Sequence, residues 1–201
     1  MIINNNREKF LNAIIYFAEN TRSCGLTKIQ KLMFLLDFEH YKQTGRSVTG
    51  ENYEAWKMGP VSPNLHNSLK SITIPSDMMS AFVIEKSIQF EKETIVIKPI
   101  QQFNEDVFTP RELSILKDLS KTHYDTSAIN MVNLLHADNS VWKTVWNNGL
   151  GDKAPIPYNL AIRDQNELNK LSELIFDREE FINQFNTIKS NAANPSSKEE
   201  I

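Results

Sequence analysis

Apolar residues recur at helical spacing in several stretches of the chain, and two of these lie near the N-terminus. The first stretch forms one broad apolar face, made by Phe10, Leu11, Ile14, Ile15, Phe17 and Ala18. Asn5 and Glu8 precede this face with the spacing of a capping box, which starts a helix. The second stretch, about residues 27–43, runs from Thr27 as a cap to Gly45 as a stop and is apolar on nearly every side. Such a helix is normally surrounded by other elements, so we predict a buried central helix over about 27–43.

The pattern changes between about residues 81 and 100. Segments 82–84 and 95–97 are rich in β-branched and aromatic residues, and the charged run 91–93 lies between them. These features predict a small β-hairpin over about 81–100. Cap-like residues indicate further helices that begin near Ser62, Thr109, Asp125 and Asp164. We therefore predict an α+β fold, mainly α-helical, with a helical core around the central helix.

The length of 201 residues suits one domain with a tail. We predict a single domain over residues 1–189, including a C-terminal helical extension over about 152–189. Residues 190–201 are polar and contain Pro195, Ser196 and Ser197, which is typical of a disordered tail.

Composition and charge narrow the classes of function. The 22 basic and 25 acidic residues leave a formal net charge of −3, which provides no broad field for a phosphate backbone and argues against nucleic acid as the partner. Cys24 is the only cysteine, so no internal disulfide can form, as suits a reducing cytosol. The N-terminus lacks the layout of a signal peptide, and no apolar run approaches the ~20 residues of a membrane span. We expect a soluble, cytoplasmic protein that does not enter a membrane.

Three groups of residues are candidates for chemistry or binding. Asp37 and His40 lie three positions apart on the central helix, so they could be a base with its orienting carboxylate, or two metal ligands. The alternative, which we favour, is a structural contact that ties the helix to the loop after Gly45. His66, His123 and His136 are scattered and supply no metal-binding spacing. No catalytic residue, metal or cofactor is therefore predicted.

The second and third groups involve basic and aromatic side chains. Lys28 and Lys31 lie near the start of the central helix, where a positive charge opposes the helix dipole. Either they meet an anion or a partner carboxylate, or they are solvated residues whose stems cover apolar neighbours. Trp56 precedes the rigid Gly59-Pro60 turn, so it is either an interface anchor or a plug of the core. We favour the core.

Residues 28–41, 45–50 and 55–61 together resemble the signature of the Panacea domain. That family shows a K-x-x-K-L-x-(aromatic) helix, a short G-(basic)-x-(apolar) passage and an A-x-x-x-G-P-V turn. His136, five residues before Val141-Trp142, is similar to the family's second and looser signature. The resemblance covers about residues 5–150, and no match extends beyond about Asp152.

The resemblance implies an antitoxin of a toxin–antitoxin system, often carried by a prophage. Such a protein neutralises a cognate toxin by direct contact, and the SocA type also delivers its toxin to a bacterial protease. The resemblance implies that the residues matching the motif are candidates for partner binding or for building the domain, namely Lys28, Lys31, Leu32, Trp56, Gly59, Pro60 and Val61. Asp37, His40 and Gly45, from the same stretch, complete the candidate set.

Two other classes of function remain as alternatives. One is a hydrolase or metal-dependent enzyme built on Asp37, His40 and His66. The other is a prophage-encoded transcriptional regulator that binds DNA. Some relatives of the resembled family carry an additional DNA-binding region, for which this chain has no spare N-terminal length, so we do not expect it to regulate its own gene.

Overall fold

The computed structural model describes residues 6–71, 73–89 and 92–193. The chain divides between residues 161 and 162 into two compact units. Our prediction of one domain over 1–189 placed no boundary at this position. All the candidate residues belong to the first unit.

Helix α2 (Leu26–Thr44) is the centre of the first unit, as predicted, and has buried residues along its length. It contacts α1 (Asn6–Asn20), α3 (Pro63–Lys70), α5 (Pro110–Thr122) and α6 (Ala128–Leu135). The predicted stop at Gly45 is confirmed, because this glycine takes a left-handed φ of 72° and donates its N–H to Tyr41 O. The predicted cap at Thr27 is wrong: Gly25 occupies the cap position and makes no side-chain cap. Asn5, the predicted cap of the first helix, lies outside the described residues.

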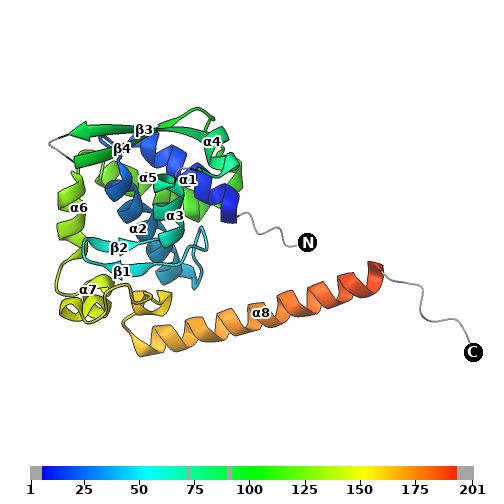
Figure 1. Cartoon of the computed structure of the whole chain (residues 1–201). Helices are drawn as coiled ribbons and strands as arrows, with labels where there is room; N and C mark the ends of the chain where they lie inside the picture. Colours follow the sequence, from blue (N-terminus) through cyan, green and yellow to red (C-terminus); the bar gives the residue numbers. More distant parts are fainter. Residues whose placement is uncertain (1–5, 72, 90–91, 194–201) are drawn as a thin grey trace, which may run out of the picture. The chain divides into compact units, whose positions relative to one another are not determined.

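A short antiparallel hairpin, β1 (Glu54–Trp56) and β2 (Gly59–Val61), follows α2 and pairs Trp56 with Gly59. The two-residue turn between these strands is Lys57-Met58, and Gly59 has a φ of 98°. Ala55 exchanges backbone hydrogen bonds with Lys153 and Ala154, so the segment after α7 (Val141–Trp146) fastens the hairpin from outside. The hairpin thereby becomes a fixed part of the core near α2 and α7 (Figure 1).

The predicted hairpin over about 81–100 is confirmed as β3 (Phe82–Gln89) paired antiparallel with β4 (Lys92–Pro99). Phe82, Ile95 and Ile97 are buried, whereas Val83 and Val96 are exposed, so its strands turn one face to the core. This hairpin lies across α1 and α4 (Ser76–Ala81) in Figure 1, at the other end of the unit from β1 and β2.

Of the other predicted starts within this unit, those at Ser62 and Thr109 are confirmed for α3 and α5, and that at Asp125 is not. The capping box of α5 is complete: Thr109 accepts from the Glu112 N–H, and the Glu112 carboxylate accepts from the Thr109 N–H. Helix α6 begins at Ala128 with Ser127 as its cap, so the start that we predicted at Asp125 is wrong. Three 3₁₀ turns complete the unit: η1 (Glu105–Val107), η2 (Asn147–Gly149) and η3 (Tyr158–Ala161).

The second unit holds α8 (Gln165–Ala193), which starts after Asp164 as predicted. Asp164 caps it by accepting hydrogen bonds from the N–H groups of Asn166 and Glu167. The helix continues through residues 190–193, which we had assigned to the tail, and residues 194–201 lie outside the described residues. Across the described chain, every helix is too short or too polar to span a lipid bilayer.

Candidate functional site

The candidate residues on α2 and the segment that follows it have two different environments. Asp37 and His40 belong to the C-terminal half of α2, and Gly45 is its C-cap, where the chain turns into residues 45–50. Lys28 and Lys31 belong to its N-terminal half, and of the two it is Lys31 that lies beside Gly59 and Pro60. Leu32 lies between the two environments and is fully buried in the main hydrophobic core.

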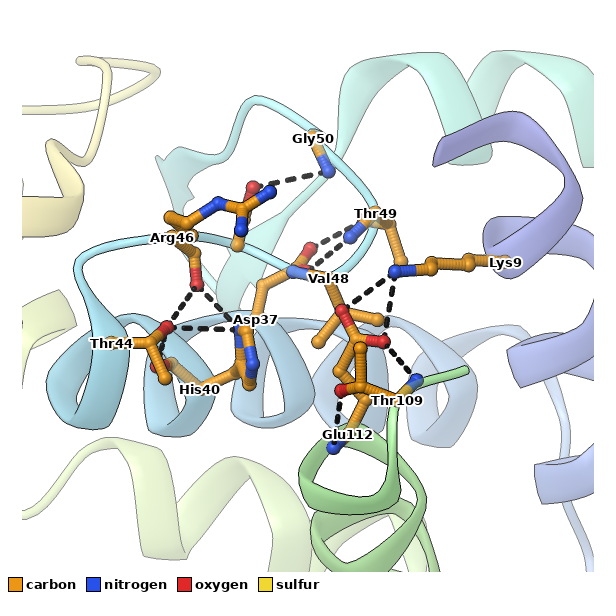
Figure 2. A network of polar contacts seen from close by, with 11 residues as sticks. Lys9, Asp37, His40, Thr44, Arg46, Val48, Thr49, Gly50, Thr109 and Glu112 are labelled. Carbon is orange, nitrogen blue, oxygen red and sulfur yellow. Dashed lines mark hydrogen bonds and ion pairs between the residues drawn. The ribbon is translucent and has the colours of Figure 1, made fainter. Parts of the chain in front are cut away.

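Asp37 holds the 45–50 loop with its carboxylate (Figure 2). Oδ1 accepts from the backbone N–H groups of Val48 and Thr49, both at 2.8 Å. Oδ2 accepts from the hydroxyls of Thr49 at 2.5 Å and Tyr53 at 2.7 Å. The side chain is completely buried, and burial raises the pKa of Asp37 to about 6 against the opposing effect of these hydrogen bonds.

His40 fastens the start of the same loop. Its Nδ1 lies 2.7 Å from Arg46 O, and the Thr44 hydroxyl lies 3.3 Å from the same nitrogen. Burial lowers the pKa of His40. Asp37 and His40 therefore grip two successive parts of one loop, which is the structural interpretation that we favoured from the sequence.

An ion pair joins α1 to α5, and it was missed by sequence reasoning (Figure 2). Lys9 on α1 donates to both carboxylate oxygens of Glu112 on α5, at 2.7 and 2.8 Å. Burial raises the pKa of Glu112, but the hydrogen bonds from Lys9 and Thr109 outweigh it and hold the pKa below its usual range. Glu112 was recognisable as a helix cap, whereas its pairing with a residue 103 positions away leaves no local signal.

The third residue of the enzyme hypothesis lies elsewhere. His66 is on α3, where its ring centroid is 4.8 Å from that of Trp56. Among the described residues, no three His, Cys, Asp or Glu side chains are grouped so that they could hold a metal ion. Asp37 and His40 therefore bind the 45–50 loop, whereas His66 lies beside Trp56, so the three residues do not form one site.

Lys28 is fully buried and its ammonium joins two loops to α2. Nζ donates to Arg22 O at 2.9 Å and to Tyr124 O at 3.0 Å. Burial lowers the pKa of this lysine. Neither of our interpretations described this residue, because its partners are main-chain carbonyls of the protein itself.

Lys31 is also buried, with 1% of its surface exposed, and its Nζ donates to Pro60 O at 2.8 Å. Burial lowers the pKa of Lys31 to about 7. The ammonium thus connects the first turns of α2 to the β1–β2 hairpin, and Pro60 in β2 supplies the acceptor. The turn that we predicted at Gly59-Pro60 is wrong, because these residues pair with β1 and the turn lies at Lys57-Met58. Of the two alternatives that we left open, a solvated side chain is wrong for both lysines.

Gly59 has to be a glycine because Lys31 packs directly against it. A Cβ there would lie 3.0 Å from Lys31 Cε and 3.1 Å from Nζ, and the φ of 98° disfavours any L side chain. The same Cβ position is 3.8 Å from Nε2 of His136. The two stretches that resemble the Panacea signature, around Lys31 and around His136, therefore meet at Gly59.

His136 stacks on Trp142, with ring centroids 3.8 Å apart and an interplanar angle of 3°. Its Nε2 is buried and has no hydrogen-bond partner within the described part of the chain. Burial lowers the pKa of His136, and the charges of Lys31 and Lys143 lower it further. This imidazole was seen in the sequence only as part of a loose motif, since nothing local places it beside Lys31.

Trp56 is half-buried, so it is neither a plug of the core nor a free anchor. Its indole N–H donates to Glu54 at 2.8 Å, and its carbonyl accepts from the Trp142 indole at 2.9 Å. Lys153 Nζ lies 5.7 Å from the ring centroid of Trp56. The ring is therefore held in place from several sides while part of it remains accessible.

A pocket of about 430 Å³ opens beside the start of α2, and we call it the α2 pocket. The first turn of α2, the β1–β2 turn, α3, β4 and the start of α6 line it, and Val61 is among its apolar walls. Its basic, aromatic and sulfur-containing lining residues are Lys31, Trp56, Lys57, Met58, His66 and Lys70. None of the lining residues that the structure describes is acidic.

Several basic side chains surround the α2 pocket. Burial lowers the pKa of His66, and the charges of Lys70 and Lys31 lower it further. Lys57 and Lys70 are exposed, and Met58 at the tip of the β1–β2 turn is 50% exposed. The pocket therefore combines apolar walls with a cationic rim and a buried amine, an arrangement suited to binding.

A family model described as "Antitoxin SocA-like, Panacea domain" matches residues 29–143, which is more than half of the chain. The matched region contains α2 from Ile29, both hairpins, α5, α6 and His136. Neither a search of curated proteins nor a search of solved structures gave a match.

Proposed function

We propose that this chain, which belongs to the Panacea domain family of SocA-like antitoxins, neutralises a cognate protein toxin in the cytoplasm by binding it directly. The observation that carries the proposal is the family match over residues 29–143, because it gives the chain a general antitoxin role. Direct contact with the toxin and the identity of the contact surface are our own additions to that role.

The disposition of the polar groups supports binding as the means of action. The side chains of Asp37, His40 and Lys28 form hydrogen bonds with backbone atoms of loops within the domain. The cations and aromatic ring that remain accessible surround the α2 pocket, with Met58 exposed at its edge. Aromatic, basic and methionine side chains are enriched in protein interfaces. These features favour a surface that grips a partner.

The proposal can be tested by co-expression. The reading frame beside the gene would be expressed from an inducible promoter, with and without this chain, in a host that lacks both. We expect growth arrest from the neighbouring protein alone and restored growth when the chain is present. If the neighbouring protein is harmless, or if the chain fails to restore growth, the proposed function is wrong.

The same experiment separates inhibition by binding from delivery to a protease. Toxin abundance would be followed after synthesis is stopped, with and without the chain. A stable toxin in rescued cells indicates inhibition by binding alone. A toxin that disappears faster in the presence of the chain indicates an adaptor that presents it to a bacterial protease.

A further inference from the structure

We propose that the α2 pocket is where the toxin docks, and that it receives an acidic segment in which a carboxylate stands next to an aromatic or aliphatic side chain. This inference rests on the proposed function, since it names the chemistry of the partner of that same domain. It assigns the Lys31 end of α2 to recognition and the Asp37 end to holding the fold.

The size and walls of the pocket fit a side-chain anchor. A volume of about 430 Å³ falls within the range of ligand pockets and accommodates a large side chain together with a neighbouring group. The walls include Trp56, Val61 and Ile95, which offer apolar and aromatic surface to a side chain of that kind. Such an anchor, buried in a preformed pocket, is what dominates the binding energy of many protein interfaces.

The charges around the pocket select a carboxylate. Lys57 and Lys70 are exposed at the pocket and Lys31 lines it from within. The described lining residues include no acidic one, and the neighbouring Glu54 carboxylate is bound to the Trp56 indole. Gly25 supplies no side-chain cap to α2, so the first N–H groups of the helix add their partial positive charge at the same place. An acidic partner therefore gains from charge complementarity, and a basic one is repelled.

Lys31 is held ready to bind an anion. An ammonium has three N–H donors, and within the described residues Nζ donates to one acceptor, Pro60 O. Contact with Gly59 and the fixed β1–β2 turn restrain the side chain, so little conformational entropy remains to be lost when a carboxylate arrives. A hydrogen bond from this buried amine to a carboxylate is charge-assisted and stronger than a neutral one.

The first experiment tests the pocket without the toxin. The full chain, labelled with ¹⁵N, would be titrated with N-acetyl-L-phenylalaninate and, separately, with the neutral N-acetyl-L-phenylalanine amide. We expect the carboxylate to shift the indole signal of Trp56 and the amide signals of residues 25–31, with affinity at least tenfold above that of the neutral compound. Equal binding of the two compounds, or shifts confined to other parts of the domain, would overturn the assignment of a carboxylate site.

The second experiment uses the toxin identified by co-expression. A double variant, Lys57→Glu with Lys70→Glu, reverses two exposed charges at the pocket. The matched control, Lys42→Glu with Arg111→Glu, makes the same change in net charge at exposed positions that do not line the pocket. We expect the pocket variant to bind the toxin at least tenfold more weakly and to lose rescue, while the control behaves as wild type.

The possible outcomes separate this inference from the proposed function. If wild type rescues growth and the pocket variant binds the toxin as wild type does, the α2 pocket is not the docking site and the antitoxin function stands. If the carboxylate probe binds but no toxin is neutralised, the proposed function falls and the pocket takes a small anion, which overturns the assignment to a toxin segment. Circular dichroism and thermal melting of each variant would establish that it is folded.

Discussion

The substitution Asp37→Asn tests whether burial or hydrogen bonding has the larger effect on the pKa of the buried Asp37 carboxylate. The substitution keeps the shape of the side chain, and the amide oxygen can still accept from the Val48 and Thr49 N–H groups. In the wild type, Oδ2 accepts hydrogen bonds from the Thr49 and Tyr53 hydroxyls. In the variant an amide NH₂ group takes the place of Oδ2 and can only donate, so the two hydroxyls must rotate and accept instead. The variant also loses the titrating group itself.

The pH dependence of stability gives the magnitude. Burial raises the pKa of Asp37 to about 6 in the folded protein, whereas an unfolded aspartate has a pKa near 3.9. The folded state therefore binds the proton more tightly, and stability from this group is fully present below about pH 4 and is lost as the pH rises through about 6. Between pH 5 and pH 7.5 the wild type should lose about 1 kcal/mol more than Asp37→Asn.

Urea unfolding of both proteins at pH 5, 6 and 7.5, at constant ionic strength, measures this difference. Asp152→Asn, a change at an exposed aspartate, serves as the control and should leave the pH dependence of the wild type unaltered. The opposite slope, in which the wild type loses stability relative to Asp37→Asn on going to pH 5, would refute the reasoning. It would mean that the hydrogen bonds to the carboxylate outweigh its burial.

Three further substitutions probe the other contacts by the same unfolding measurement. Gly59→Ala should lose about 1–3 kcal/mol, because it forces a side chain into a left-handed conformation and against Lys31; an unchanged stability would mean that the turn can relax. Lys28→Met should lose about 2 kcal/mol, because Arg22 O loses the ammonium donor and Tyr124 O keeps only its bond from the Arg22 N–H; a neutral result would contradict this dependence on Lys28. Glu112→Gln should lose about 2 kcal/mol of stability at pH 7. It should also lessen the loss of stability on acidification, because the pKa of Glu112 is depressed in the folded protein and its contribution is lost as the pH falls through that pKa. If stability falls at low pH as it does in the wild type, the Lys9–Glu112 pair is not the cause of that fall.

The sequence predicted the elements that depend on local pattern. These elements follow from residues that lie close together in the sequence, and they are the buried α2, its stop at Gly45, the β3–β4 hairpin and the capping box of α5. The errors at helix starts are local as well. Thr27 and Asp125 were favourable caps by residue type, but Gly25 and Ser127, each two residues away, occupy the cap positions.

The environment of the lysines could not be predicted in this way. The acceptors of Lys28 and Lys31 include carbonyls 96 and 29 positions away in the chain, and a carbonyl carries no mark of residue type. Every residue offers the same acceptor, so no pattern of side chains indicates which one a buried ammonium will meet. Position in the fold decides it.

The α2 pocket was missed for a related reason. Lys57 and Lys70 drew no attention in the sequence, and His66 was considered only with Asp37 and His40. The packing of α3 and the β1–β2 turn against the start of α2 brings the three basic residues together. The closeness of His136 to Gly59 likewise arises from the approach of α6 to β2. The motif singled out these segments in the sequence, and the fold shows that they lie together.

The measurement that tests the central claim most directly is the binding of purified toxin to this purified chain. Size-exclusion chromatography with light scattering, together with calorimetry, would be performed on the two proteins mixed without any other component. We predict one complex of defined stoichiometry and loss of the toxin's activity on mixing. Separate elution of the two proteins, with growth rescue persisting in cells, would contradict neutralisation by direct contact.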